Sequence, residues 1–151
     1  GLLFPFELLG ENADGNGIIR TILGVDEDSG SLTLAGDVPE GGYLKLMHAS
    51  TERLIDAAEH AAFKLQPMAH RHAGPALALL VSCVGRKLVM GDRVDEEVEA
   101  VCSVLGANTT VAGFYSYGEI SGSQFSGDCR LHNQTMTITW LAERAAPQGS
   151  R

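Results

Sequence analysis

Ala76-Leu-Ala-Leu-Leu-Val-Ser-Cys83 is a nearly continuous apolar run near the middle of a 151-residue chain. A run of this length and composition is typical of a strand that is covered on both faces. Strands of that kind lie in sheets against which helices pack, so the flanking segments are expected to supply helices. The chain is long enough for one domain with its own hydrophobic core.

Two amphipathic helices are predicted, one on each side of this strand in the sequence. Ser50 is a good N-cap for a helix over residues 51–65, in which apolar residues recur at helical spacing. Asp92 is expected to cap the second helix, which should end at Gly106 because glycine is favoured just after a helix. The apolar stripe of the second helix is predicted to consist of Val94, Val98, Val101 and Leu105.

Other segments have the composition of strands. Residues 18–25, 31–35 and 43–48 predict a local antiparallel meander, and residues 109–117 and 131–141 predict two later strands around a glycine-containing loop at 118–130. The resulting order favours an α+β (mixed α/β) domain, with an antiparallel-rich β-sheet and two main helices covering a face.

The domain is expected to occupy residues 18–142. Residues 1–17 are interpreted as an N-terminal segment, either the end of a preceding domain or an entering strand, and residues 143–151 as a flexible tail. Residues 66–74 are interpreted as a polar linker in which His70 and His72 form a solvated pair.

The composition excludes several classes of partner. The chain carries a net charge of −8, from 19 acidic and 11 basic residues, whereas nucleic-acid affinity depends on clustered Lys and Arg. No apolar run approaches the roughly 20 residues that span a bilayer, so no membrane partner is expected.

Three cysteines fit reduced thiols in a cytoplasmic protein better than a disulfide framework. No phosphate-cradling glycine motif occurs, and no cofactor is expected.

Cys83 and Arg86 are the first candidates for a functional site. Cys83 ends the apolar strand, and the ends of sheet strands are common places for ligand sites. A nearby Arg86 would lower the pKa of the thiol and make it nucleophilic, or would clamp a ligand carboxylate. The alternatives are an inert buried thiol and an arginine that pairs with Asp92 or Glu119.

Tyr115, Tyr117 and Glu119 alternate, so they would lie on one face of a continuing strand. Aromatic walls with one carboxylate suit a small ligand that bears an amine. The alternative is cross-strand aromatic packing, with Glu119 solvated at the loop.

His132 and Asn133 begin the last predicted strand. They would hydrogen-bond a ligand, or His132 would act as a general base. The alternative is a loop-to-strand junction in which polar side chains satisfy backbone groups. Cys129-x-x-His132 is only half of a zinc motif, and no metal site is predicted.

At three of these motifs the sequence resembles the C-terminal domain of the FIST family (F-box and intracellular signal transduction proteins). The matching motifs are Ser82-Cys-Val-Gly-Arg86, Gly113-Phe-Tyr-Ser-Tyr-Gly-Glu-Ile120 and Leu131-His-Asn-Gln-Thr-Met-Thr137, within a resemblance that covers roughly residues 18–141. The resemblance implies a sensory module for small ligands, amino acids or their derivatives among them. It also implies an N-terminal FIST half and signalling output domains as partners. It carries over no catalytic residue, only candidate ligand-binding positions: Cys83, Arg86, Tyr117, Glu119, His132 and Asn133.

The leading hypothesis is therefore a cytoplasmic sensor that binds a small ligand. Arg86 would take a ligand carboxylate, and Glu119, backed by Tyr115 or Tyr117, would take an amine. The loop at 118–130 would then close over the ligand.

Two other hypotheses stay open. One is a cysteine-dependent enzyme with Cys83 as nucleophile, His132 as base and Glu119 as the orienting acid. The other is a ligand-free interaction module that exposes an apolar patch from Leu2, Leu3, Phe4 and Phe6.

Overall fold

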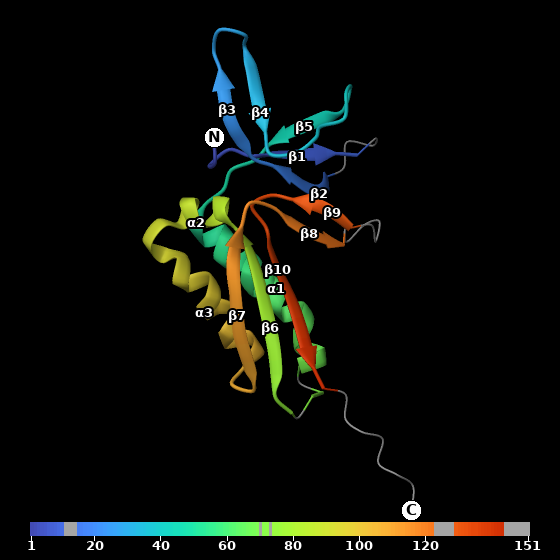
Figure 1. Cartoon of the computed structure of the whole chain (residues 1–151), viewed down its shortest axis with the longest axis vertical. Helices are drawn as coiled ribbons and strands as arrows, with labels where there is room; N and C mark the ends of the chain where they lie inside the picture. The colour runs from blue at the N-terminus through green and yellow to red at the C-terminus, as the bar shows by residue number, and fades with distance from the viewer. Residues whose placement is uncertain (11–14, 70, 73, 123–128, 144–151) are drawn as a thin grey trace, which may run out of the picture.

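The computed structural model describes the chain except for residues 11–14, 70, 73, 123–128 and 144–151 (Figure 1). The described part forms an α+β fold with mostly antiparallel strand pairs, which confirms the predicted class. The strands are β1 (Phe6–Leu9), β2 (Gly15–Arg20), β3 (Ile22–Asp26), β4 (Ser31–Leu34), β5 (Tyr43–Leu46), β6 (Ala76–Cys83), β7 (Thr109–Ser116), β8 (Glu119–Gly122), β9 (Cys129–His132) and β10 (Met136–Ala142). The helices are α1 (Thr51–Ala69), α2 (Val84–Met90) and α3 (Val94–Leu105).

The helices pack on a three-stranded sheet of order β10-β6-β7, in which β6 is parallel to β7 and antiparallel to β10. Ala78 and Leu80 of β6 are buried against α1 and α3. Leu77 and Leu79, on the other face, are 37% and 36% exposed. The prediction that this strand is covered on both faces is wrong, since both long helices lie on the same side of the sheet (Figure 1).

The first helix is longer than predicted. It runs from Thr51 to Ala69 and includes Pro67, which was expected to lie in a linker. Proline lacks an N–H and cannot donate to the preceding turn. Because Pro67 lies near the end of the helix, its missing N–H removes only one of the last backbone hydrogen bonds. The helix therefore continues for two more residues, to Ala69.

The strand β6 ends at Cys83 and passes directly into α2, which begins at Val84. Gly85 is buried, and a Cβ at that position would lie 3.2 Å from Cγ of Gln134. The absence of a side chain therefore lets the start of α2 approach the turn before β10.

Two details of the other long helix also differ from prediction. Asp92 lies in a short 3-10 turn, Gly91–Arg93, and the N-cap position of α3 is Arg93, which makes no capping side-chain bond. Val98 is 37% exposed, and the buried stripe consists of Glu97, Val101, Val104 and Leu105. The predicted end is confirmed, because Gly106 follows the helix with φ +77°.

The N-terminal strands form a separate layer above the helices in Figure 1. The single strand predicted over 18–25 is wrong, because Thr21 separates two strands, β2 and β3. The strand β2 joins a sheet of order β2-β1-β5, whereas β3 pairs with β4. Only the β3–β4 part of the predicted meander is present, because β5 pairs with β1. Residues of the 1–17 segment thus supply the central strand of this sheet.

The long strand predicted over 131–141 is broken into β9 and β10. Gln134 in the intervening turn has φ +51°, a left-handed conformation that a strand cannot contain. The predicted loop at 118–130 contains β8 and β9, which pair with each other, while its residues 123–128 lie outside the described part. Among the helices that the structure describes, none is both long and apolar enough to cross a membrane.

Candidate functional site

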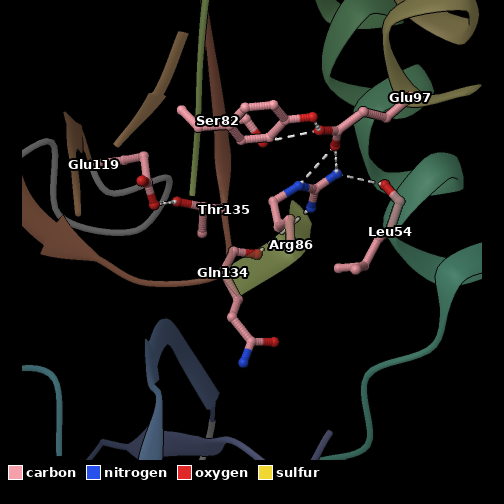
Figure 2. A network of polar contacts seen from close by, with 8 residues as sticks. Leu54, Ser82, Arg86, Glu97, Glu119, Gln134 and Thr135 are labelled. Carbon is pink, nitrogen blue, oxygen red and sulfur yellow. Dashed lines mark hydrogen bonds and ion pairs between the residues drawn. The ribbon is translucent and has the colours of Figure 1, made fainter. Parts of the chain in front are cut away.

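Arg86 of α2 and Glu97 of α3 form a buried ion pair next to the end of β6 (Figure 2). Arg86 Nη2 lies 2.7 Å and Nε lies 2.9 Å from Oε2 of Glu97. The arginine is 2% exposed and the glutamate is fully buried. Nη2 also donates to the Leu54 carbonyl at 2.7 Å, and Nη1 makes a long contact of 3.5 Å with the Gln134 carbonyl.

The second carboxylate oxygen of Glu97 accepts hydrogen bonds from Ser82 Oγ and Tyr115 Oη, both at 3.0 Å. Buried charge is tolerated when it is both paired and hydrogen-bonded, and Glu97 meets both conditions. Burial, followed by the neighbouring Glu97 charge, raises the pKa of Tyr115 to about 12. With the bond from Arg86 to Leu54 of α1, this network ties three helices to two strands.

Glu97 was not among the predicted site residues. The sequence does indicate that Glu97 is buried. It precedes Val101 by four residues and Val104 by seven, so the three residues lie on one face of the helix. An acid on an apolar stripe needs a cation or several donors. The chain order alone does not say that Arg86 is the cation.

Glu119 lies in a second group at the same end of the sheet. Its two oxygens accept from Ser116 Oγ at 2.7 Å and from Thr135 Oγ1 at 3.0 Å, and the residue is 1% exposed. Both oxygens are therefore already engaged. Tyr117 is 90% exposed because β7 ends before it, so the expected common face of the two tyrosines and Glu119 does not form.

Tyr115 instead points toward the helices. Its hydroxyl donates to Glu97, and Lys87 Nζ lies 5.1 Å from the centre of its ring, within range of a cation–π contact. Neither expected partner of Arg86, Asp92 or Glu119, binds it.

Cys83 is 4% exposed, and burial raises the pKa of its thiol. Burial outweighs the influence of Arg86, whose guanidinium is bonded to Glu97, so Cys83 fits the alternative of an inert buried thiol. A nucleophilic cysteine needs a lowered thiol pKa, because the thiolate is the reactive form. The Cys83 backbone N–H donates to the Thr135 carbonyl at 3.0 Å, which fixes the end of β6 against the turn before β10.

His132 and Asn133 are buried, with 7% and 2% exposure. His132 faces Glu119 in the β8–β9 register. Within the described part of the chain, His132 Nε2 and Asn133 Oδ1 have no hydrogen-bond partner. Buried polar atoms are rarely left unpaired, so these two atoms mark a place where a water or ligand would be stabilising.

Two cavities adjoin the ion pair from different sides. One, of about 370 Å³, lies between α1 and the turn before β10 and is lined by Ala57, His60, Ala61, Lys64, Arg86, Gln134, Thr135 and Met136. The other, of about 270 Å³, lies against β7 and is lined by Leu80, Ser82, Glu97, Val98, Val111, Ala112, Gly113, Phe114, Tyr115 and Met136. Of the predicted ligand-binding residues, Arg86 lines the first and Tyr115 the second.

The remaining candidates, Cys83, Tyr117, Glu119, His132 and Asn133, line neither of these two cavities. The segments around positions 83, 116 and 132 do meet at one end of the sheet, as Cys83 is in register with Ser116 and Glu119 with His132. Among the residues that the structure describes, no group of three or more His, Cys, Asp or Glu side chains is placed to hold a metal ion.

The turn at Gln134 and Thr135 connects these groups to the N-terminal layer. The Gln134 carbonyl contacts Arg86, and the Thr135 hydroxyl binds Glu119 (Figure 2). Gln134 Nε2 also donates to the Leu2 carbonyl at 2.8 Å. A second link is Arg20 Nη1, which donates to the Leu131 carbonyl at 3.0 Å. A displacement of this turn would therefore reach both the helices and the N-terminal strands.

Comparison with known proteins identifies one family. A model described as the FIST C domain matches residues 1–122 of the chain, which includes the first two of the three motifs described above. Neither the curated proteins nor the solved structures contain a match to this chain.

Proposed function

The chain belongs to the FIST C domain family of signal-transduction sensory domains, and we propose that it senses a small ligand that carries a carboxylate. An amino acid or a derivative of one is the favoured class. The ligand would bind in the 370 Å³ cavity between α1 and the turn before β10, which we call the α1 cavity. The observation that carries the proposal is the charge of its lining: among the residues that the structure describes, Lys64 and Arg86 contribute positive charge, and no acidic residue lines the cavity.

Lys64 supplies the unpaired positive charge of the α1 cavity. It makes no ion pair with any residue in the described ranges, whereas the charge of Arg86 is largely balanced by Glu97. Arg86 keeps donor capacity all the same, because its Nη1 makes only the 3.5 Å contact with the Gln134 carbonyl. A carboxylate between Lys64 and Nη1 would gain charge-assisted hydrogen bonds from both.

The amine of an amino acid would bind differently from the sequence-based expectation. Glu119 was expected to accept it, but Glu119 is 1% exposed, already binds Ser116 and Thr135, and does not line the α1 cavity. The lining of the α1 cavity offers an amine a carbonyl at Gln134 and a hydroxyl at Thr135. The carboxylate is therefore the group that distinguishes ligands, and the amine adds less.

The signal would travel through the turn that the ligand touches. Gln134 lines the α1 cavity, holds a left-handed backbone conformation and binds the Leu2 carbonyl. Left-handed non-glycine residues cost energy and are frequent at functional sites. A ligand that binds one arrangement of this turn more tightly would shift the N-terminal layer with it. An N-terminal FIST half and output domains are the partners we expect to receive this change, in the cytoplasm.

Binding of amino acids and simple carboxylates, each compared with its neutral amide, tests the proposal by thermal shift and calorimetry. A ligand that binds only the folded form raises the melting temperature. Lys64→Gln should weaken carboxylate binding about tenfold, the effect of one charge-assisted bond. Lys45→Gln, on β5 and away from the α1 cavity, is the matched control. Equal binding of acids and amides, or equal losses in both variants, would reject the α1 cavity as the site.

A ligand-free interaction module is the second candidate, because Leu3 and Phe4 are each 47% exposed. Contiguous exposed apolar surface marks contact sites, whereas single exposed apolar residues are normal. Size-exclusion chromatography of a Leu3→Ser, Phe4→Ser variant tests this: self-association of the parent chain should disappear in the variant. A parent chain that elutes as a monomer at all concentrations argues against the module.

A further inference from the structure

A third cavity lies at the opposite end of the sheet from Arg86. It measures about 480 Å³ and is bounded by the end of α1, the starts of β6 and β7, the loop after α3 and the end of β10. Its lining includes Gln66, His72, Ser103, Leu105, Asn108 and Trp140 and, among the residues that the structure describes, no Asp, Glu, Lys or Arg. It shares no lining residue with the α1 cavity. We call it the Trp140 cavity.

Two nitrogen atoms beside the Trp140 cavity lack partners. His72 Nε2 and Trp140 Nε1 are both buried without a hydrogen bond in the part of the chain that the structure describes. The two rings meet edge to face, with centres 5.6 Å apart and planes at 83°. His72 was expected to be solvated, but it is only partly exposed and its Nε2 is buried. His70, its predicted companion, lies outside the described residues.

An unpaired buried donor is costly, and indole nitrogen can only donate. Imidazole Nε2 also donates when it carries the ring proton, so one oxygen acceptor would satisfy both nitrogens at once, and Trp140 Nε1 is the one that requires it. Gly74, which also lines the cavity, keeps the space beside the imidazole free, since a Cβ there would lie 3.1 Å from His72 Nε2. No acidic side chain from the described part of the chain lines the cavity, so nothing there favours an amine instead.

We propose that the Trp140 cavity is a second binding site, for a small molecule whose carbonyl or carboxylate oxygen accepts hydrogen bonds from Trp140 Nε1 and His72 Nε2. The polar side chains of Gln66, Ser103 and Asn108 stand around the same space and contact the rest of the ligand. Leu105 supplies apolar surface on the inner side. The site does not depend on the α1 cavity.

The single tryptophan of the chain provides a direct test. Its indole N–H gives one signal in a ¹H–¹⁵N spectrum, and a new acceptor at Nε1 shifts that signal downfield. Acetate and acetamide are the probes: saturable shifts with acetate alone assign the oxygen to a carboxylate, and shifts with acetamide assign it to a neutral carbonyl. His72→Phe, which retains an aromatic ring, should weaken binding about tenfold. Gly74→Ala, which crowds Nε2, should weaken it as well.

The matched control is His48→Phe, an exposed histidine on the N-terminal layer, which should leave the titration unchanged. Lys64→Gln should also leave it unchanged, which separates this site from the α1 cavity. The proposal is overturned if neither probe shifts the indole signal. It is equally overturned if His72→Phe and Gly74→Ala both bind the probe as the parent chain does.

Discussion

Glu97→Gln is expected to destabilise the protein strongly, although it only replaces one carboxylate oxygen with an amide N–H₂ group. The substitution removes the charge that Arg86 faces, while Arg86 stays buried at 2% exposure. Two hydrogen bonds to a charged oxygen, at 2.7 and 2.9 Å, are lost or replaced by an amide that cannot neutralise the guanidinium. The introduced amide N–H₂ can only face Ser82 and Tyr115, whose hydroxyls would then have to accept hydrogen bonds where they now donate.

The magnitude follows from these contacts. Hydrogen bonds to charged groups contribute about 1.5–3 kcal/mol each, and breaking a buried ion pair costs about 3–5 kcal/mol. We expect a loss of about 4 kcal/mol in the free energy of unfolding. For a chain of this length that corresponds to a melting temperature lower by roughly 10 °C. Because native stability is about 5–15 kcal/mol, a large share of it rests on this one carboxylate.

Urea unfolding followed by far-UV circular dichroism measures this loss. Glu99→Gln on the same helix is the matched control, because Glu99 is exposed and its substitution should change stability by less than about 0.5 kcal/mol. The double variant Arg86→Met, Glu97→Leu should be more stable than Glu97→Gln, because no charge is left without a partner. A cost below about 1 kcal/mol for Glu97→Gln, or a double variant less stable than the single one, would refute the assignment of Glu97 as the required counter-charge.

Three further outcomes are expected. Because burial raises the pKa of Tyr115 to about 12, the stability that depends on its neutral form is present below about pH 10 and is lost as the pH rises toward 12. In the parent chain this decline in the free energy of unfolding should amount to about 1–2 kcal/mol, after allowance for the partial solvent exposure of Tyr115. Tyr115→Phe should flatten the decline, and Tyr117→Phe should not. Equal dependence of stability on alkaline pH in the two variants would contradict this. Iodoacetamide should label the two exposed cysteines of the native chain well before Cys83, and preferential labelling of Cys83, read by mass spectrometry, would restore the enzyme hypothesis. Gly113→Ala should cost about 3 kcal/mol in chemical unfolding, because a Cβ there would overlap a backbone oxygen of β6, whereas Gly24→Ala, with 3.9 Å of room, should cost under about 1 kcal/mol.

The arrangement of polar groups at the end of the sheet was only partly predictable. Arg86 and Tyr115 were identified from their positions in motifs, and each lines a cavity, but their shared partner Glu97 was missed. The predicted pairing of Arg86 and Glu119 with one ligand assumed that both were free. Whether a carboxylate is free depends on its neighbours in space, here Ser116 and Thr135, and only one of these is close to Glu119 in sequence.

Local patterns determined much of this protein from the sequence alone. Helical spacing located α1 and α3, an apolar run located β6, and Gly106 marked the end of α3, because each depends on residues within a few positions of one another. The FIST resemblance likewise rests on short motifs.

The tertiary structure decided the rest, since the deciding contacts join residues far apart in the chain. An apolar strand has the same composition whether one face or both are covered, and only the placement of α1 and α3 on the same side left Leu77 and Leu79 exposed. Gln134 breaks the last strand and binds Leu2, 132 positions away. Burial also left His72 Nε2 and Trp140 Nε1 without partners among the residues that the structure describes. No spacing rule reports such contacts, because hydrogen bonding and desolvation depend on distance in space and not on distance in sequence.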